Sequence, residues 1–241
     1  MLIMEEGKYV SRDEVACIDT PSSTDTWRPV PHIDVIEAVT EVVRAHDWDI
    51  ADERFGLASE GKEMFGVMEI ARSSSPQWHR CIGMRNSHDK SLAIGLSAGI
   101  VVLVCSNLAF GGARLINRKH TSRIDLNELI ARAVASLEDD FLTTETRCEE
   151  LKDAYLKDDD EARSCIVRAA ELGVINSSDI LPVYREYKLP SHDEFMEPTR
   201  WSLLNAFTET VKKYPTQRMD HSYLTLNRAF GLDGREATIF A

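Results

Sequence analysis

The hydrophobic period of the chain changes near Arg123, and this change constrains the fold more than any other feature. Before it, apolar residues alternate with small or polar ones, as at Leu92, Ile94 and Leu96, with the period of two that is typical of a β-strand. After it, the segment 125–142 repeats apolar residues at the spacing of an amphipathic helix. A strand-rich half followed by a helical half predicts the α+β class rather than alternating β-α-β units.

The first half is expected to form an antiparallel sheet with one crossing helix. The helix is predicted over 32–46, beginning after Pro31. The stretches "DERFGLAS" and "EMFGVMEIAR" flank "EGK", where Gly61 allows a positive φ, so they predict a β-hairpin. The stretch "KYVSRDEVACI" is read as a strand or an entry arm. Further strands are expected in "WHRCIGM", in "SLAIGLSAG" and in "IVVLVC", and "GG" at 111–112 is expected to turn the chain into one more.

The second half is expected to be helical. The helix that starts at 125 is predicted to run on toward Leu151, and later helices are predicted to end near Gly173, Pro215 and Gly231. The sequence therefore predicts two parts, a strand-rich α+β domain over 1–124 and a helical region over 125–241 that packs on it.

The charged residues are distributed unevenly. The net charge of −12 would discourage binding to a polyanion, but residues 71–123 carry 8 Lys and Arg against a single acid, Asp89. Residues 1–70 carry 6 basic and 16 acidic residues, and residues 124–241 carry 14 and 23. We call residues 71–123 the basic segment, and we expect it to present the one surface that attracts an anionic partner.

Several classes of protein are disfavoured by the composition. The five cysteines form no C-x-x-C pair, which argues against a disulfide framework and a thiolate zinc site. The longest apolar run, Ile100 to Cys105, is far shorter than the roughly 20 residues of a membrane span. The N-terminus lacks the pattern of a signal peptide, so a cytoplasmic protein without membrane contact is expected. No phosphate-binding loop, dinucleotide fingerprint or nucleophile elbow appears.

The stretch "MRNSHDKS" at 84–91 places six polar residues between two apolar runs. The six are Arg85, Asn86, Ser87, His88, Asp89 and Lys90. One interpretation is a solvated hairpin turn, because such residues are common in turns. The other is a site in which the histidine titrates near neutral pH, the aspartate orients it and the flanking cations hold phosphate.

Two further stretches carry candidate binding residues. Asn107 follows Ser106 at the end of the strand in "VCSNLAF", a position that suits a site or a turn equally. The stretch "RLINRKHTSR" gathers five potential cations, which are Arg114, Arg118, Lys119, His120 and Arg123. Such a cluster either contacts phosphates or protects an edge strand from aggregation. Trp78 and Phe110 would stack on bases or belong to the core. A metal site of His88, Asp89 and His120 lacks ligand spacing, and no metal is predicted.

Separated motifs resemble those of a phage- and plasmid-related family of prokaryotic proteins of unknown function. The motifs are Asn86 to Asp89, Cys105 to Asn107, His120, and Asn205 to Glu209 in "NAFTE". They span roughly residues 30–213, and Lys90 departs from the smaller residue common in the family. The resemblance implies a role in DNA metabolism, recombination or interference with host defence, and it carries over no catalytic residue.

Three functions are therefore in view. The first is a protein that binds or anneals single-stranded DNA and forms homo-oligomers. Its phosphate contacts would come from Arg85, Lys90, Arg114, Arg118, Lys119 and Arg123, with Asn86, His88 and Asn107 shaping the groove. His120 is counted among the residues that bind nucleic acid or phosphate. The second is an enzyme acting on a phosphate-bearing substrate, with His88 as the general acid/base and Asp89 orienting it. The third is an inhibitor that meets a host defence factor through its acidic surface.

Overall fold

The computed structural model describes residues 8–71, 77–102, 107–118, 130 and 137–240, and over 107–118 it describes the course of the backbone. The chain divides into two compact units. We call the first, residues 6–99 and 113–141, the sheet unit, and the second, residues 1–5, 100–112 and 142–241, the helical unit.

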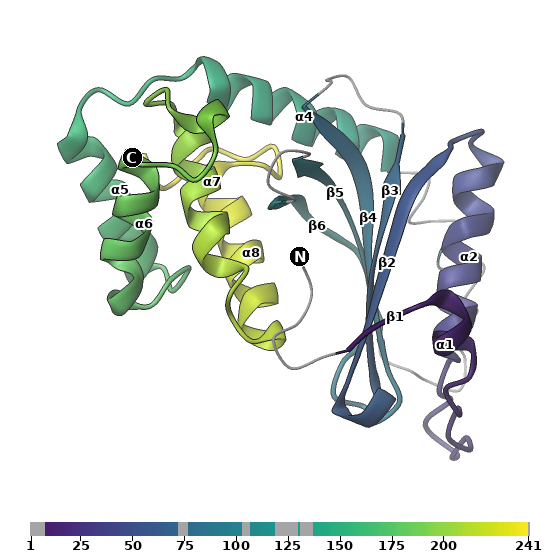
Figure 1. Ribbon diagram of the computed structural model, residues 1–241. Helices are drawn as coiled ribbons and strands as arrows, with labels where there is room; N and C mark the ends of the chain where they lie inside the picture. The colour runs from purple at the N-terminus through teal and green to yellow at the C-terminus, as the bar shows by residue number, and fades with distance from the viewer. Residues whose placement is uncertain (1–7, 72–76, 103–106, 119–129, 131–136, 241) are drawn as a thin grey trace. The chain divides into compact units, whose positions relative to one another are not determined.

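Six strands form one sheet in the order in which they occur along the chain (Figure 1). They are β1 (Lys8–Val10), β2 (Ile50–Ala58), β3 (Glu63–Ile70), β4 (Trp78–Ser87), β5 (Ile94–Val102) and β6 (Asn107–Arg118). The pairings from β1 to β4 are antiparallel, with Phe55 opposite Gly66 and Val67 opposite Gly83. The predicted hairpin is confirmed, since the turn between β2 and β3 holds Gly61 at φ 84°. With helices filling the C-terminal half, the α+β class is confirmed.

The helix predicted at 32–46 is α2 (His32–Ala45), which lies along one face of the sheet (Figure 1). Val35, Ile36 and Val39 of this helix are fully buried in one apolar cluster with Met64 and Met68 of β3. The two methionines are four residues apart and point to the same face of their strand, which is why one helix covers both. Each such side chain contributes about 1.5–3 kcal/mol on burial.

A short helix, α1 (Arg12–Ala16), precedes α2 and was not predicted. Only the first three residues of "KYVSRDEVACI" form a strand. Ser11 then opens the helix with a capping box, in which its Oγ accepts from the Glu14 backbone N–H at 3.2 Å and a Glu14 carboxylate oxygen accepts from the Ser11 N–H at 2.8 Å. The S-x-x-E spacing in the sequence is the signal for this motif.

The last two strands differ from their prediction. Residues 94–102 form one continuous strand, so "SLAIGLSAG" and the start of "IVVLVC" are not separate strands. Gly111 and Gly112 lie inside β6 rather than at a turn. A glycine pair is typical of turns but is also tolerated inside a strand. There it weakens the strand, because glycine has no side chain to pack.

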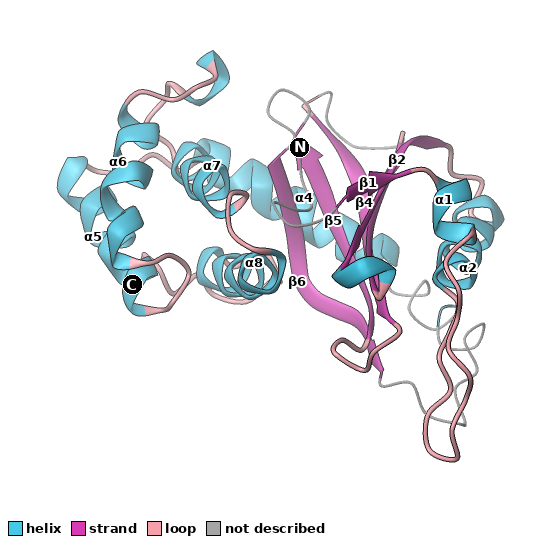
Figure 2. Cartoon of the chain, turned by 60° about the horizontal axis from the view of Figure 1, so that its bottom comes forward, coloured by secondary structure: helices cyan, strands magenta, loops and turns pink. Residues whose placement is uncertain are grey.

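The helical unit contains α5 (Asp159–Glu171), α6 (Ile180–Lys188), α7 (Arg200–Val211) and α8 (Thr216–Phe230), as Figure 2 shows. The helix α4 (Leu137–Asp153) passes from the first unit into the second, and it reaches Leu151 as predicted. The predicted start of this helix over 125–136 lies, apart from residue 130, outside the described residues. α8 ends at Gly231, whose φ of 72° is the left-handed conformation favoured at helix C-termini. Within the described part of the chain, every helix is too short or too polar to cross a bilayer.

Candidate functional site

The polar stretch 84–91 is shared between a strand and a turn. Its first four residues complete β4, and the chain then turns toward β5. Asn86 and Ser87 have no exposed surface and His88 is 5 % exposed, so the solvated-turn interpretation is wrong for these three residues. Asp89 and Lys90 are exposed, as that interpretation expected.

Asn86 and His88 meet a third residue, His32, at the start of α2, and we call the three the histidine–asparagine cluster. The two imidazole rings are stacked, with their centroids 3.7 Å apart and their planes 2° from parallel. The Asn86 Nδ2 donates to the Val30 carbonyl at 2.8 Å and to the His32 Nδ1 at 2.9 Å. The His88 Nε2 lies 3.0 Å from the same Val30 carbonyl, and the His32 Nε2 lies 3.0 Å from the Gly61 carbonyl.

These contacts fix the proton positions of both rings. A carbonyl oxygen only accepts, so the Nε2 of each histidine carries its hydrogen. The His32 Nδ1 is then the acceptor for the Asn86 amide, so the His32 ring is neutral. Among the described residues, the His88 Nδ1 and the Asn86 Oδ1 are buried and have no hydrogen-bond partner. The cluster therefore ties the start of α2 to the turn between β2 and β3 and to the end of β4.

His88 is held in its neutral form by its surroundings. Burial lowers its pKa, and the Val30 and Asp19 carbonyls and the Asp89 carboxylate offset only part of that effect. The Oδ1 of Asp89 accepts from the Ser91 backbone N–H at 2.9 Å, and among the described residues no hydrogen bond joins Asp89 to His88. The orienting role expected of Asp89 is therefore not supported by a hydrogen bond to His88 among the described residues.

We predict that the depressed pKa of His88 makes the protein less stable as the pH falls. Below the ordinary histidine pKa of about 6.5, His88 is protonated in the unfolded chain but remains neutral in the folded one. The free energy of unfolding therefore decreases as the pH falls, until it reaches the lower pKa that His88 has in the folded state. A His88→Gln variant should lose this part of the slope. Urea unfolding of both proteins between about pH 5 and pH 8 measures the difference, and identical slopes would contradict the assignment.

The cations predicted to bind phosphate lie in different surroundings. Lys90 is exposed at the turn after β4, at φ 69°, with its Nζ 4.9 Å from the centroid of the Trp27 ring. Arg85 is half-buried against β5, where a Cβ added at Gly95 would come within 2.8 Å of its Nε. Arg80, also in the basic segment, is buried and bonds both carboxylate oxygens of Glu138.

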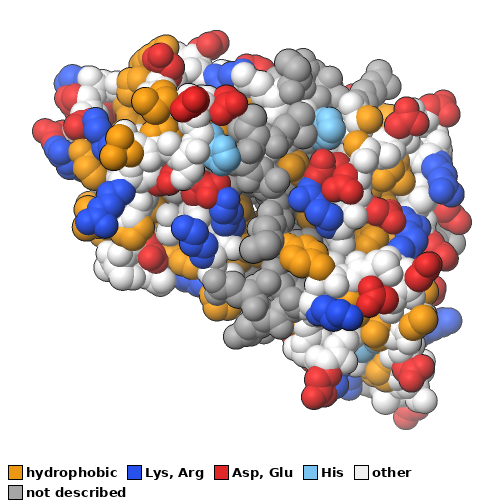
Figure 3. All heavy atoms as spheres, in the orientation of Figure 1, with side chains coloured by type: hydrophobic (Ala, Val, Ile, Leu, Met, Phe, Trp, Pro, Cys, Tyr) orange, Lys and Arg blue, Asp and Glu red, His pale blue; other side chains and the backbone are white. Residues whose placement is uncertain are grey.

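The remaining candidates lie on β6 or beyond it. Asn107, Arg114 and Arg118 are backbone positions of β6. Lys119, His120 and Arg123 lie outside the described residues, as does Ser106. Trp78 has no exposed surface and belongs to the core. In the view of Figure 3, basic and acidic side chains are interleaved over the described surface, so that view shows no wholly positive face among the described residues.

Two residues of this region were not anticipated, His32 and Trp27. His32 was counted only as the start of a helix, and its partners are 54 and 56 residues away in sequence. The alternation of Met84 and Asn86 along one face of β4, with His88 directly after the strand, is the signal that could have shown that these polar side chains point toward the core.

The "NAFTE" motif belongs to α7, whose residues from Trp201 to Val211 are all buried. The Asn205 Nδ2 donates to the Trp201 carbonyl at 2.9 Å, and the Thr208 Oγ1 donates to the Asn205 carbonyl at 2.9 Å. Both bonds return to the helix's own backbone, so this motif is placed to hold the helix in its packing.

Comparison with known proteins identifies one family. The family model described as "Domain of unknown function (DUF932)" matches residues 21–230. Neither the curated proteins nor the solved structures include a significant match to this chain.

Proposed function

This chain belongs to the DUF932 family, a domain of unknown function, and we propose that it is a phage- and plasmid-associated protein that binds single-stranded DNA. In this proposal it anneals strands during recombination and works as a homo-oligomer in the cytoplasm. The observation that carries the proposal is the contact between one exposed cation, Lys90 at the turn between β4 and β5, and the aromatic ring of Trp27.

The turn combines the two chemistries that single-stranded nucleic acid requires. Lys90 is exposed and lies over the ring of Trp27, and Arg28, the next residue after Trp27, is also exposed. Trp27 is half-buried, whereas the tryptophans at 48, 78 and 201 are buried. A cation can contact phosphate while an accessible aromatic ring stacks on a base, and this combination tolerates any sequence.

The charge pattern of the sequence supports the same surface. Lys90 lies in the basic segment, which contains 8 basic residues and one acidic residue. That acidic residue is Asp89, the neighbour of Lys90 in sequence. Arg114 and Arg118 occupy positions four residues apart on β6. Binding through such cations releases counterions from the DNA, so its strength should fall steeply with salt.

We predict that replacing Lys90 with glutamine weakens binding to single-stranded DNA by a similar factor for every sequence and lowers the slope of log affinity against log salt by about 1. Fluorescence anisotropy of a labelled oligonucleotide between about 50 and 200 mM salt measures both quantities. Quenching of the intrinsic tryptophan fluorescence by DNA should disappear in Trp27→Phe, because Trp27 is the half-exposed tryptophan.

Lys8 provides the matched control. Its side chain is 79 % exposed in the same unit, and its Nζ pairs with Glu14 at 3.1 Å, so Lys8→Gln removes an equal charge away from the turn. The proposal fails if the unmodified protein does not retain DNA at about 50 mM salt, or if Lys8→Gln and Lys90→Gln reduce the affinity equally.

A further inference from the structure

We propose that the helical unit binds a phosphate monoester in a cavity of about 580 Å³ beside the end of α8. We call it the arginine cavity, because Arg147, Arg200 and Arg235 line it together with the rings of Phe230 and Phe240. All five residues belong to the helical unit, so this site does not depend on the DNA contact proposed for the sheet unit.

Arg200, the first residue of α7, has hydrogen-bond donors to spare. Its Nε is buried and has no partner among the described residues, and its guanidinium lies 3.7 Å from the nearest Glu161 oxygen, beyond hydrogen-bond length. Its guanidinium carbon lies 4.0 Å from the centroid of the Phe240 ring, which holds the group in one place. A guanidinium has five N–H donors in a fixed plane, so Arg200, whose Nε is unpartnered and whose one ion pair is long, still has donors for an oxyanion.

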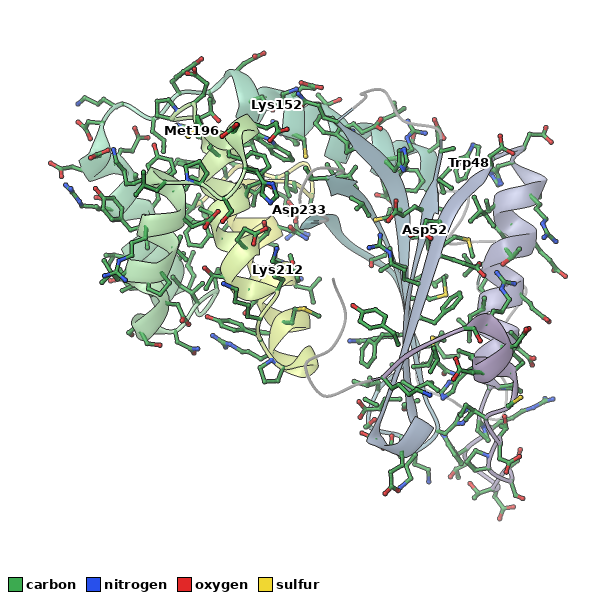
Figure 4. All side chains as sticks on the ribbon, in the orientation of Figure 1. Trp48, Asp52, Lys152, Met196, Lys212 and Asp233 are labelled. Carbon is green, nitrogen blue, oxygen red and sulfur yellow. The ribbon has the colours of Figure 1, made fainter. Side chains whose placement is uncertain are left out.

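The loop after α8 supplies the opposite wall of the cavity. Gly231 adopts a left-handed φ of 72°, and a Cβ at this position would come within 2.6 Å of the Arg235 carbonyl oxygen, so the loop can fold this tightly only with glycine there. The Arg147 Nη2 donates to the Gly234 carbonyl at 3.2 Å and fastens the loop. Asp233, labelled in Figure 4, lies 3.5 Å from the Arg235 Nε, so Arg235 has only one long ion pair among the described residues.

The charges of the lining favour an anion. The lining itself carries three arginines and two glutamates, and one of these, Glu150, already accepts from the Arg147 Nη1 at 2.5 Å. The other, Glu236, is exposed and opposes an anionic ligand. Two further acids, Glu161 and Asp233, lie outside the lining and form long ion pairs with Arg200 and Arg235. A guanidinium fork matches the spacing of phosphate oxygens, which is why arginine is favoured at phosphate sites.

The aromatic rings and the size of the cavity define the rest of the ligand. Phe230 and Phe240 meet edge to face, with centroids 5.2 Å apart, and they give the cavity an apolar wall. Its volume falls within the roughly 300–1,000 Å³ of small-molecule sites. A nucleoside monophosphate has the matching chemistry, and the same group occurs at the 5′-phosphorylated end of a DNA strand.

Isothermal titration of the full chain with dAMP tests the site. The unmodified protein should bind dAMP, and Arg200→Gln should weaken that binding about ten-fold, because a charged bidentate contact is lost. Glu236→Gln should tighten it, since it removes the opposing charge. Arg163→Gln is the matched control, because Arg163 lies on α5 outside the cavity and pairs with Asp160, and its affinity should be unchanged.

Arg235→Gln is a second test of the site, in case Arg200→Gln weakens binding only because it misfolds. The Arg235 side chain is 79 % exposed, so its replacement should weaken dAMP binding without altering the fold. Tighter binding of a 5′-phosphorylated oligonucleotide than of both dAMP and the 5′-hydroxyl strand identifies a DNA end as the source of the phosphate, and tighter binding of dAMP than of the phosphorylated strand identifies the free nucleotide. Lys90→Gln should leave dAMP binding intact, which separates this site from the proposed function. The absence of binding to dAMP and to both oligonucleotides, or unchanged affinity in both arginine variants, overturns the proposal.

Discussion

Replacing Asn86 with alanine is expected to lower the free energy of unfolding by about 3 kcal/mol, because it removes two buried hydrogen bonds and leaves a cavity. The Asn86 amide is the donor to both the Val30 carbonyl and the His32 Nδ1, and its side chain has no exposed surface. Without it, the His32 Nδ1 loses its hydrogen-bond donor. Urea unfolding followed by circular dichroism gives the change in free energy.

Two further variants make this prediction specific. Asn86→Asp keeps the shape but places an acceptor against two acceptors, so it should destabilise the protein near neutral pH at least as much as alanine does. Asn176→Ala is the matched control, because Asn176 is exposed and its side chain makes no capping hydrogen bond. If Asn86→Ala changed the stability no more than Asn176→Ala, the cluster could not be the tie between α2 and the strands.

The parts of the fold that could be predicted are those with a local cause. The positive φ of Gly61 and the end of a helix at Gly231 follow from chemistry that acts over a few residues, and both were predicted where they occur. The turn predicted at Gly111–Gly112 was wrong because the same residue type is tolerated in a strand, and the pairing of that strand is decided by residues far away in sequence.

The candidate site shows the same division. Asn86 and His88 were singled out from a run of polar residues, but their burial depends on Val30 and His32, which reach them across more than 50 residues of sequence. The run of polar residues also indicated a partner for His88 in Asp89, its neighbour in the chain. His88 and Asp89 follow the end of β4 in the turn, and the residue that stacks on His88 is instead the distant His32.

A second polar network crosses β2 and β3, away from the histidine–asparagine cluster. Asp52 of β2, labelled in Figure 4, lies opposite Glu69 of β3 in the strand register. Two facing carboxylates repel each other, and the guanidinium of Arg54 offsets this by pairing with both. The Glu69 side chain is only 7 % exposed, and its other neighbour is the His79 Nδ1 at 3.4 Å.

Replacing Arg54 with methionine is therefore expected to lower the free energy of unfolding by about 3 kcal/mol, because the Glu69 carboxylate is left buried beside Asp52 without its cation. The loss should shrink as the pH falls from about 7 to about 4, since an uncompensated buried carboxylate has a raised pKa and is protonated more readily in the folded state. The double variant Arg54→Met/Glu69→Leu should recover most of the stability, because a buried pair replaced by apolar side chains leaves no charge behind. Urea unfolding of the three proteins at both pH values measures these free energies of unfolding. A double variant as unstable as the single one would mean that Arg54 stabilises the sheet by packing and not by neutralising Glu69.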